Sequence, residues 1–173
     1  MLEKTNHTIF ETLQLFYKNC GLSFNDLCFS DESKEYDACT FTLDSKKIIH
    51  RTAKITPTKN GQFVTVWKRN SDGITEPFNT KDDFDAYIIT VKFEDKLGQF
   101  IFPKELLAKN KIITHNGSDG KRGIRVYPPW DITSSKQAEK TQTWQLNYFI
   151  QFKPHLVDTE TKLINLINYD YAK

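Results

Sequence analysis

Seven basic residues fall in one segment of the chain that contains no acidic residue. The segment runs from residue 46 to residue 71 and contains Lys46, Lys47, Arg51, Lys54, Lys59, Lys68 and Arg69. Acidic residues gather on both sides of it, at 31–44 and 72–95. The net charge of +2 would not by itself suggest a nucleic acid partner. Charge clustered in this way is typical of a polyanion-binding surface, although a pair of strands with lysines on a solvated face would look the same.

A second basic block lies later in the chain, at Lys121, Arg122 and Arg125. Two glycines accompany these cations, and glycine lets backbone amides approach a phosphate closely. A basic turn that leads into a strand is the alternative. The two blocks together give seven candidate contacts to nucleic acid phosphates. They are Lys54, Lys59, Lys68, Arg69, Lys121, Arg122 and Arg125.

Three residues on two neighbouring predicted strands could form a site. Asp37 is predicted to open one strand, and Thr52 and Lys54 lie two apart on the next, so they share a face. The arrangement resembles the PD-(D/E)XK nuclease pattern, which has an aspartate on one strand and an acidic residue two positions before a lysine on its neighbour. In that family two carboxylates hold Mg²⁺ against a phosphate and the lysine orients the attacking water. The resemblance implies catalytic positions at Asp37, Thr52 and Lys54.

The pattern is degenerate, because Thr52 stands where the nucleases have a carboxylate. A threonine hydroxyl is a neutral and weak ligand for Mg²⁺, so metal affinity and catalysis should both be low. Glu35, two residues before Asp37, and Glu11, on a predicted helix, are the candidates for a second carboxylate beside Asp37. No other cofactor is predicted.

The triplet Thr52-Ala53-Lys54 recurs as Thr90-Val91-Lys92. Each places a threonine and a lysine on the same face of a predicted strand. Echoes of three residues arise by chance, so this one does not indicate an internal duplication.

The apolar pattern predicts one α/β domain with a mixed sheet flanked by helices. A capping box at Thr8 to Glu11 predicts a helix that ends near Cys20. Further helices are expected to start at Pro103, to run from Ser134 to about Phe152, and to cover 160–168. The predicted strands are 37–43, 46–55, 63–69, 87–93, 99–102 and 123–127.

Several classes of protein are excluded. The chain has no Gly-x-Gly-x-x-Gly, no Walker lysine motif, no His-Glu-x-x-His and no Gly-x-Ser-x-Gly. Its three cysteines are never spaced as Cys-x-x-Cys, which argues against a disulfide framework and a zinc site. Its apolar runs are shorter than a membrane span, and its first thirty residues do not form a signal peptide. We therefore expect a cytoplasmic protein without membrane insertion.

Four blocks of sequence resemble the MepB family of small bacterial proteins. They are AKITPTKNGQFVTVWKR, DAYIITVKFEDKLGQFIFPKELL, GKRGIRVYPPWD and SKQAEKTQTWQ. The resemblance implies one domain over 1–173, with a core at about 8–153 and a C-terminal extension at 154–173. It also implies a fold like that of PD-(D/E)XK endonucleases, with an α-β-β-β-α-β core. Association with a multidrug efflux operon and binding of nucleic acid are the further implications.

The sequence therefore predicts a protein that binds DNA or RNA, single- or double-stranded, mainly through phosphates and without sequence specificity. One alternative is a Mg²⁺-dependent phosphodiesterase that uses Asp37 and Lys54 with Glu35 or Glu11. A second alternative is a protein interaction module.

Overall fold

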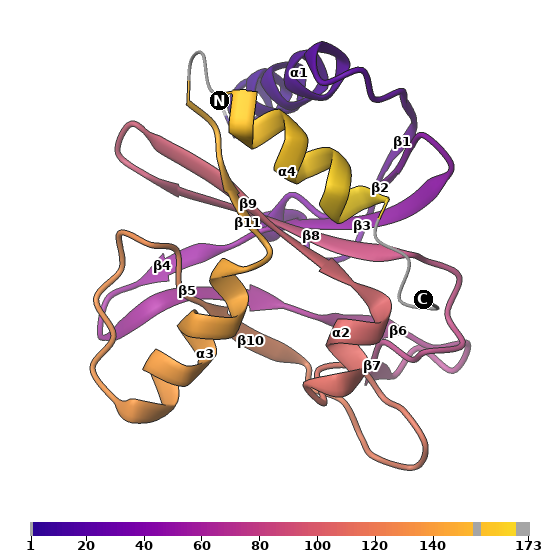
Figure 1. The fold of residues 1–173 in the computed structure, drawn as a ribbon. Helices are drawn as coiled ribbons and strands as arrows, with labels where there is room; N and C mark the ends of the chain where they lie inside the picture. Colours follow the sequence, from indigo (N-terminus) through magenta and orange to yellow (C-terminus); the bar gives the residue numbers. More distant parts are fainter. Residues whose placement is uncertain (1, 154–156, 169–173) are drawn as a thin grey trace.

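A six-stranded mixed sheet forms the centre of the computed structural model, which describes residues 2–153 and 157–168 (Figure 1). In spatial order its strands are β1 (Phe24–Phe29), β2 (Cys39–Leu43), β3 (Lys46–Thr52), β8 (Ala86–Phe93), β9 (Lys96–Pro103) and β11 (Phe149–Gln151). β3 and β8 are parallel, and every other neighbouring pair is antiparallel. β8 is central and almost continuously buried, as its apolar sequence requires.

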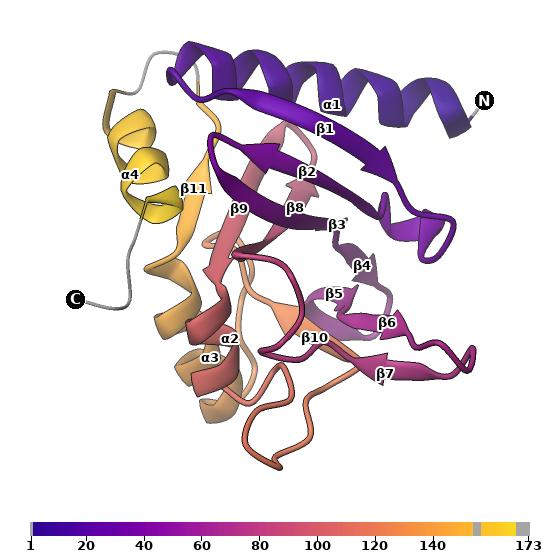
Figure 2. The same cartoon turned by 90° about the vertical axis from the view of Figure 1, so that its right-hand side faces the viewer.

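Two helices cover one face of this sheet. They are α1 (Leu2–Asn19) and α4 (Val157–Ile167), and Figure 2 shows α1 lying across β1, β2 and β3. Leu13 and Tyr17 of α1 and Leu163 of α4 are buried in one apolar cluster with inward side chains of the sheet, such as Ile88 and Ile101. The apolar residues of α1 recur at helical spacing, so they share one buried face.

The opposite face packs against two short helices and two small sheets. The helices are α2 (Lys104–Lys109) and α3 (Lys136–Leu146). One small sheet has the order β10 (Gly123–Val126), β5 (Lys59–Thr65) and β4 (Lys54–Thr56), and the other pairs β6 (Trp67–Arg69) with β7 (Thr75–Pro77). Val64, Val126 and Leu107 join Ile89 and Phe100 of the large sheet in the second buried cluster. The mixed α/β fold predicted from the sequence is confirmed.

The predicted strand 46–55 is interrupted at Ala53. β3 ends at Thr52 in the large sheet, and β4 begins at Lys54 in the small one. The Ala53 N–H donates to the carbonyl of Thr90 in the parallel strand β8 at 2.9 Å. After this hydrogen bond the chain leaves the large sheet. The crossover from β3 to β8 then consists of β4 to β7, where the expected core has a helix.

Other elements also differ from the prediction. The predicted helix from Ser134 to about Phe152 ends at Leu146, and β11 follows, because Phe149 and Ile150 pair with β9. Its cap is Ser135, whose hydroxyl accepts from the Ala138 N–H at 3.1 Å. α1 begins at Leu2, before the predicted capping box. β1 was not predicted, because its burial does not alternate and so leaves no period-two pattern to detect.

Buried polar side chains are linked beneath α1. The Tyr17 hydroxyl donates to Gln99 Oε1 at 2.6 Å, and Gln99 Nε2 donates to Thr90 Oγ1 at 3.0 Å. Thr90 Oγ1 also contacts His50 Nε2 at 2.8 Å. All four residues are completely buried, so each of these hydrogen bonds satisfies a group that water does not reach.

Among the described residues, the helices lack the combination of length and apolar composition needed to cross a lipid bilayer.

Candidate nucleic-acid interface

A cavity of about 1020 Å³ opens where the parallel strands β3 and β8 end. Its lining includes Thr52, the last residue of β3, and Ala53, which comes directly after it. Lys54 of β4 and Lys92 of β8 also line the cavity. The opposite wall is formed by the end of β1 and the segment before β2, including Phe29, Ser30, Asp31, Lys34, Glu35, Asp37 and Ala38. The cavity thus brings together the three residues of the degenerate nuclease pattern, together with Glu35. Glu11 lies exposed on α1 and is not part of this lining.

The two Thr-x-Lys triplets lie side by side. Thr52 pairs with Thr90 in the parallel register of β3 and β8, so Lys54, the first residue of β4, and Lys92 of β8 both follow this pair at the same end of the large sheet. Lys54 and Lys92 consequently line the same cavity. The sequence contained the signal for Lys92 in the repeated triplet, but only the parallel register of the strands gives the repeat a spatial meaning.

The lysines of the cavity differ in their partners. Lys34 forms an ion pair with Asp31 at 3.0 Å. Lys54 places its ammonium over the ring of Tyr36, 4.6 Å from the centroid, and Lys92 is half-buried. Over residues 2–153 and 157–168, neither Lys54 nor Lys92 has an ion pair with a carboxylate. Their charge therefore remains available to an anionic ligand.

The two threonines also differ. The Thr90 hydroxyl is bonded to His50 and Gln99, whereas the buried Thr52 hydroxyl has no hydrogen-bond partner within the described part of the chain. An unpaired buried hydroxyl costs about 1–3 kcal/mol of stability. Thr52 retains this cost in the wall of this cavity.

We expect Thr52→Val to leave the free energy of unfolding unchanged or to raise it by about 1 kcal/mol, because the methyl group replaces an unpaired hydroxyl of similar shape. The matched change Thr90→Val should lower it by about 1–3 kcal/mol, because it leaves His50 and Gln99 without a partner. Urea unfolding of both variants measures the difference. Equal destabilisation would show that the Thr52 hydroxyl is paired in solution.

Asp37 does not open a strand as the sequence suggested. It follows the short 3₁₀ helix η1 (Lys34–Tyr36) with a left-handed backbone, at φ 50° and ψ 44°, and β2 starts two residues later at Cys39. Its N–H donates to the Lys34 carbonyl at 3.0 Å, which closes the turn. Aspartate tolerates this conformation better than most residues, so its identity is explained in part by the turn.

The residues present do not fit a magnesium site. No group of three or more Asp, Glu, His or Cys side chains that could hold a metal ion occurs in the part of the chain that the structure describes. Thr52 adds no charge, and Glu35 is exposed on η1. Mg²⁺ needs several oxygen ligands in near-octahedral geometry and is usually held by one or two carboxylates.

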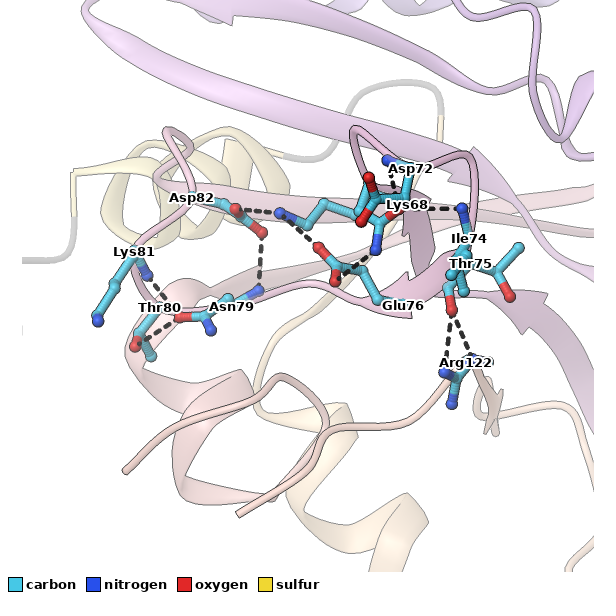
Figure 3. A network of polar contacts seen from close by, with 11 residues as sticks. Lys68, Asp72, Ile74, Thr75, Glu76, Asn79, Thr80, Lys81, Asp82 and Arg122 are labelled. Carbon is cyan, nitrogen blue, oxygen red and sulfur yellow. Dashed lines mark hydrogen bonds and ion pairs between the residues drawn. The ribbon is translucent and has the colours of Figure 1, made fainter. Parts of the chain in front are cut away.

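Four of the seven predicted phosphate contacts form hydrogen bonds or ion pairs with other residues of the protein. Figure 3 shows Lys68 between Asp82 and Glu76, with its ammonium 2.5 Å and 3.3 Å from their carboxylate oxygens. The hydrogen bond to Asp82 raises the pKa of Lys68, so the ammonium stays charged. Arg69 binds Glu32 through two hydrogen bonds of 2.6 and 3.1 Å. Both cations are thereby neutralised locally.

Arg122 and Arg125 hold turns. Arg122 donates to the Thr75 carbonyl at 2.9 Å (Figure 3). Arg125 donates to the carbonyl of Gly61 at 3.1 Å and to the Thr56 hydroxyl at 2.8 Å, and so fixes the turn between β4 and β5. Besides Arg69 and Arg122, the exposed residues of the predicted set are the three lysines Lys54, Lys59 and Lys121. Only Lys54 of these three lines the cavity, since Lys59 and Lys121 border other depressions.

The fold and the cavity define a mixed α/β protein whose cavity, at the end of its parallel strand pair, is lined by three lysines and three acidic residues. A family model described as MepB-like matches residues 30–151, so the chain belongs to the MepB-like family. The crystal structure of MepB is similar over 84% of this chain and 98% of that chain, with 34% sequence identity and a TM-score of 0.75. The structure of a bacterial homing endonuclease is more distant, with 13% identity, a TM-score of 0.46, and coverage of 79% of this chain and 85% of that one. A comparison of the sequence with curated proteins finds no significant match.

Proposed function

We propose that this protein binds nucleic acid through its phosphates, at the cavity where β3 and β8 end, and does not cleave it. One observation carries the proposal: the parallel register places Lys54 and Lys92, neither of them ion-paired within the described residues, in the wall of one large cavity. Ammonium groups without a carboxylate partner attract phosphates and make binding dependent on salt. The basic segment around Lys54 adds longer-range attraction.

This proposal retains only some of the seven phosphate contacts that the sequence predicted. Lys54 is kept and Lys92 is added, while Lys59 and Lys121 contribute from the surrounding surface. Lys68, Arg69, Arg122 and Arg125 act mainly inside the protein, since each has the internal partners described above. Phosphate contacts carry no sequence information, so binding is expected to be weakly selective. In this proposal the protein works in the cytoplasm, and its link to a multidrug efflux system is the one that the family resemblance implies.

A salt titration tests the proposal. The affinity for a labelled oligonucleotide, measured by fluorescence anisotropy, should fall linearly on a log–log scale as salt rises. The slope should be about −0.7 to −0.9 for each phosphate engaged, so contacts to two phosphates give about −1.4 to −1.8. A response that does not depend on salt would rule out a phosphate-directed site.

A nuclease is the second candidate, because Asp37 and Glu35 line the same cavity as Lys54. Incubation of several forms of nucleic acid with Mg²⁺ or Mn²⁺ distinguishes the two functions. Cleavage that disappears in Lys54→Ala would favour the nuclease, whereas binding without cleavage favours our proposal.

A further inference from the structure

One wall of the cavity carries an exposed aromatic ring. Phe29, the last residue of β1, is 55% exposed and lines the cavity with Lys54 and Lys92. Its ring meets Phe10 of α1 edge to face, with the centroids 5.2 Å apart, so it is held in position from the helix side. The exposed part of the Phe29 ring is therefore available to a ligand in this cavity.

The cavity thus offers two kinds of contact to a nucleotide. Phe29 provides an apolar ring, and Lys54 and Lys92 provide positive charge beside the carboxylates of Asp31, Glu35 and Asp37. An unpaired nucleotide presents the matching groups, which are a flat base and an anionic phosphate. In a duplex the faces of the bases are already stacked, so only an unpaired base can stack on a protein ring.

We propose that this cavity selects single-stranded nucleic acid by accepting an unpaired nucleotide, whose base packs on Phe29 while Lys54 and Lys92 contact its phosphates. This inference rests on the proposed function and specifies its ligand. Stacking on aromatic rings tolerates all bases, so the selectivity is for strandedness and not for sequence.

The chain provides a matched control for the ring. Phe93 is the residue after Lys92, is 40% exposed, and borders a different depression, with Ile55 and Trp130. Successive residues of a strand point to opposite faces, so Phe93 points away from the face that carries Lys92. Phe93→Ala removes the same side chain as Phe29→Ala without changing the cavity.

The experiment measures the affinity of the full chain and its variants for a labelled single strand and for the duplex of the same sequence. We expect the wild type to prefer the single strand. Phe29→Ala should weaken single-strand binding about 5- to 150-fold, as expected for the loss of one stacked base, and should change duplex binding little. Phe29→Tyr should keep the preference, and Phe93→Ala should bind as the wild type does. Thermal unfolding identifies any variant that fails to fold, and Phe29→Tyr then carries the test, because it keeps the ring.

Two outcomes separate the inference from the function beneath it. Salt-dependent binding of both forms with equal affinity, unchanged by Phe29→Ala, would overturn the single-strand inference and leave phosphate binding standing. If neither the single strand nor the duplex binds at low salt, both proposals are overturned.

Discussion

Lys54→Gln combined with Lys92→Gln should lower the affinity for nucleic acid about ten- to a hundredfold at low salt. Each lysine contributes a charge-assisted contact of about 1 kcal/mol or more, and glutamine removes the charge while keeping a side chain of similar reach. The slope of log affinity against log salt should also become shallower by about 1.4 to 1.8. Because Lys54 and Lys92 line a solvent-open cavity and lack ion pairs in the described residues, the thermal stability should change little.

The control for this double variant removes the same charge elsewhere. Lys18 and Lys109 each lie in the last turn of a helix, outside the cavity. Replacing both with glutamine lowers the net charge equally, so it reports the effect of overall charge alone. If the two double variants lose affinity to the same extent, the cavity is not the binding site.

The stability of the protein should depend on His50 below pH 6.5. His50 is completely buried, and burial lowers its pKa to about 3, with the charge of Arg51 acting in the same direction and the hydrogen bond to the Asp37 carbonyl opposing it. The unfolded chain binds a proton near pH 6.5, whereas the folded protein does not until about pH 3. The free energy of unfolding should therefore fall as the pH drops from 6.5 toward 3, by up to about 1.4 kcal/mol per pH unit, and His50 should have no influence above 6.5.

Urea unfolding between pH 7 and pH 4 measures this dependence against His50→Gln. The glutamine amide can still reach the Thr90 hydroxyl, which His50 Nε2 contacts at 2.8 Å, but it does not titrate. Carboxylates contribute equally to both proteins, so the difference between their slopes isolates His50. Identical slopes would show that His50 is protonated in the folded protein.

The sequence predicted the elements better than it predicted how they are joined. The apolar runs of β8 and β9 and the buried face of α1 were recognised, because burial imposes a period on their residues. The break at Ala53 could not be recognised, since 46–55 is equally compatible with one strand or with two. Lys54 joins the small sheet because β4 pairs with β5. The sequence pattern does not indicate which of the possible strand pairings forms.

Three candidate site residues were chosen from the sequence, Asp37, Thr52 and Lys54, and the structure places all three in the lining of one cavity. Lys92 and Phe29 also line this cavity but were not chosen, because their positions depend on the parallel register of β3 and β8 and on the strand β1, which has no alternating pattern. Conversely, Lys68 and Arg69 seemed available from their charge alone, and only the folded chain brings Asp82 and Glu32 to them.

Ala53 has a further consequence, because the residues on its two sides belong to different sheets. Lys54 moves with the small sheet and Lys92 with the large one, so the distance between the two ammonium groups depends on how the sheets are docked. Hydrogen bonds that cross this boundary run from the Ala53 N–H to the Thr90 carbonyl at 2.9 Å, from Gln62 Nε2 to the Lys92 carbonyl at 3.2 Å and from the Tyr87 hydroxyl to the Thr65 carbonyl at 2.9 Å. A phosphate held by both lysines would be a further link between the two sheets, so occupancy of the cavity would be thermodynamically coupled to their docking.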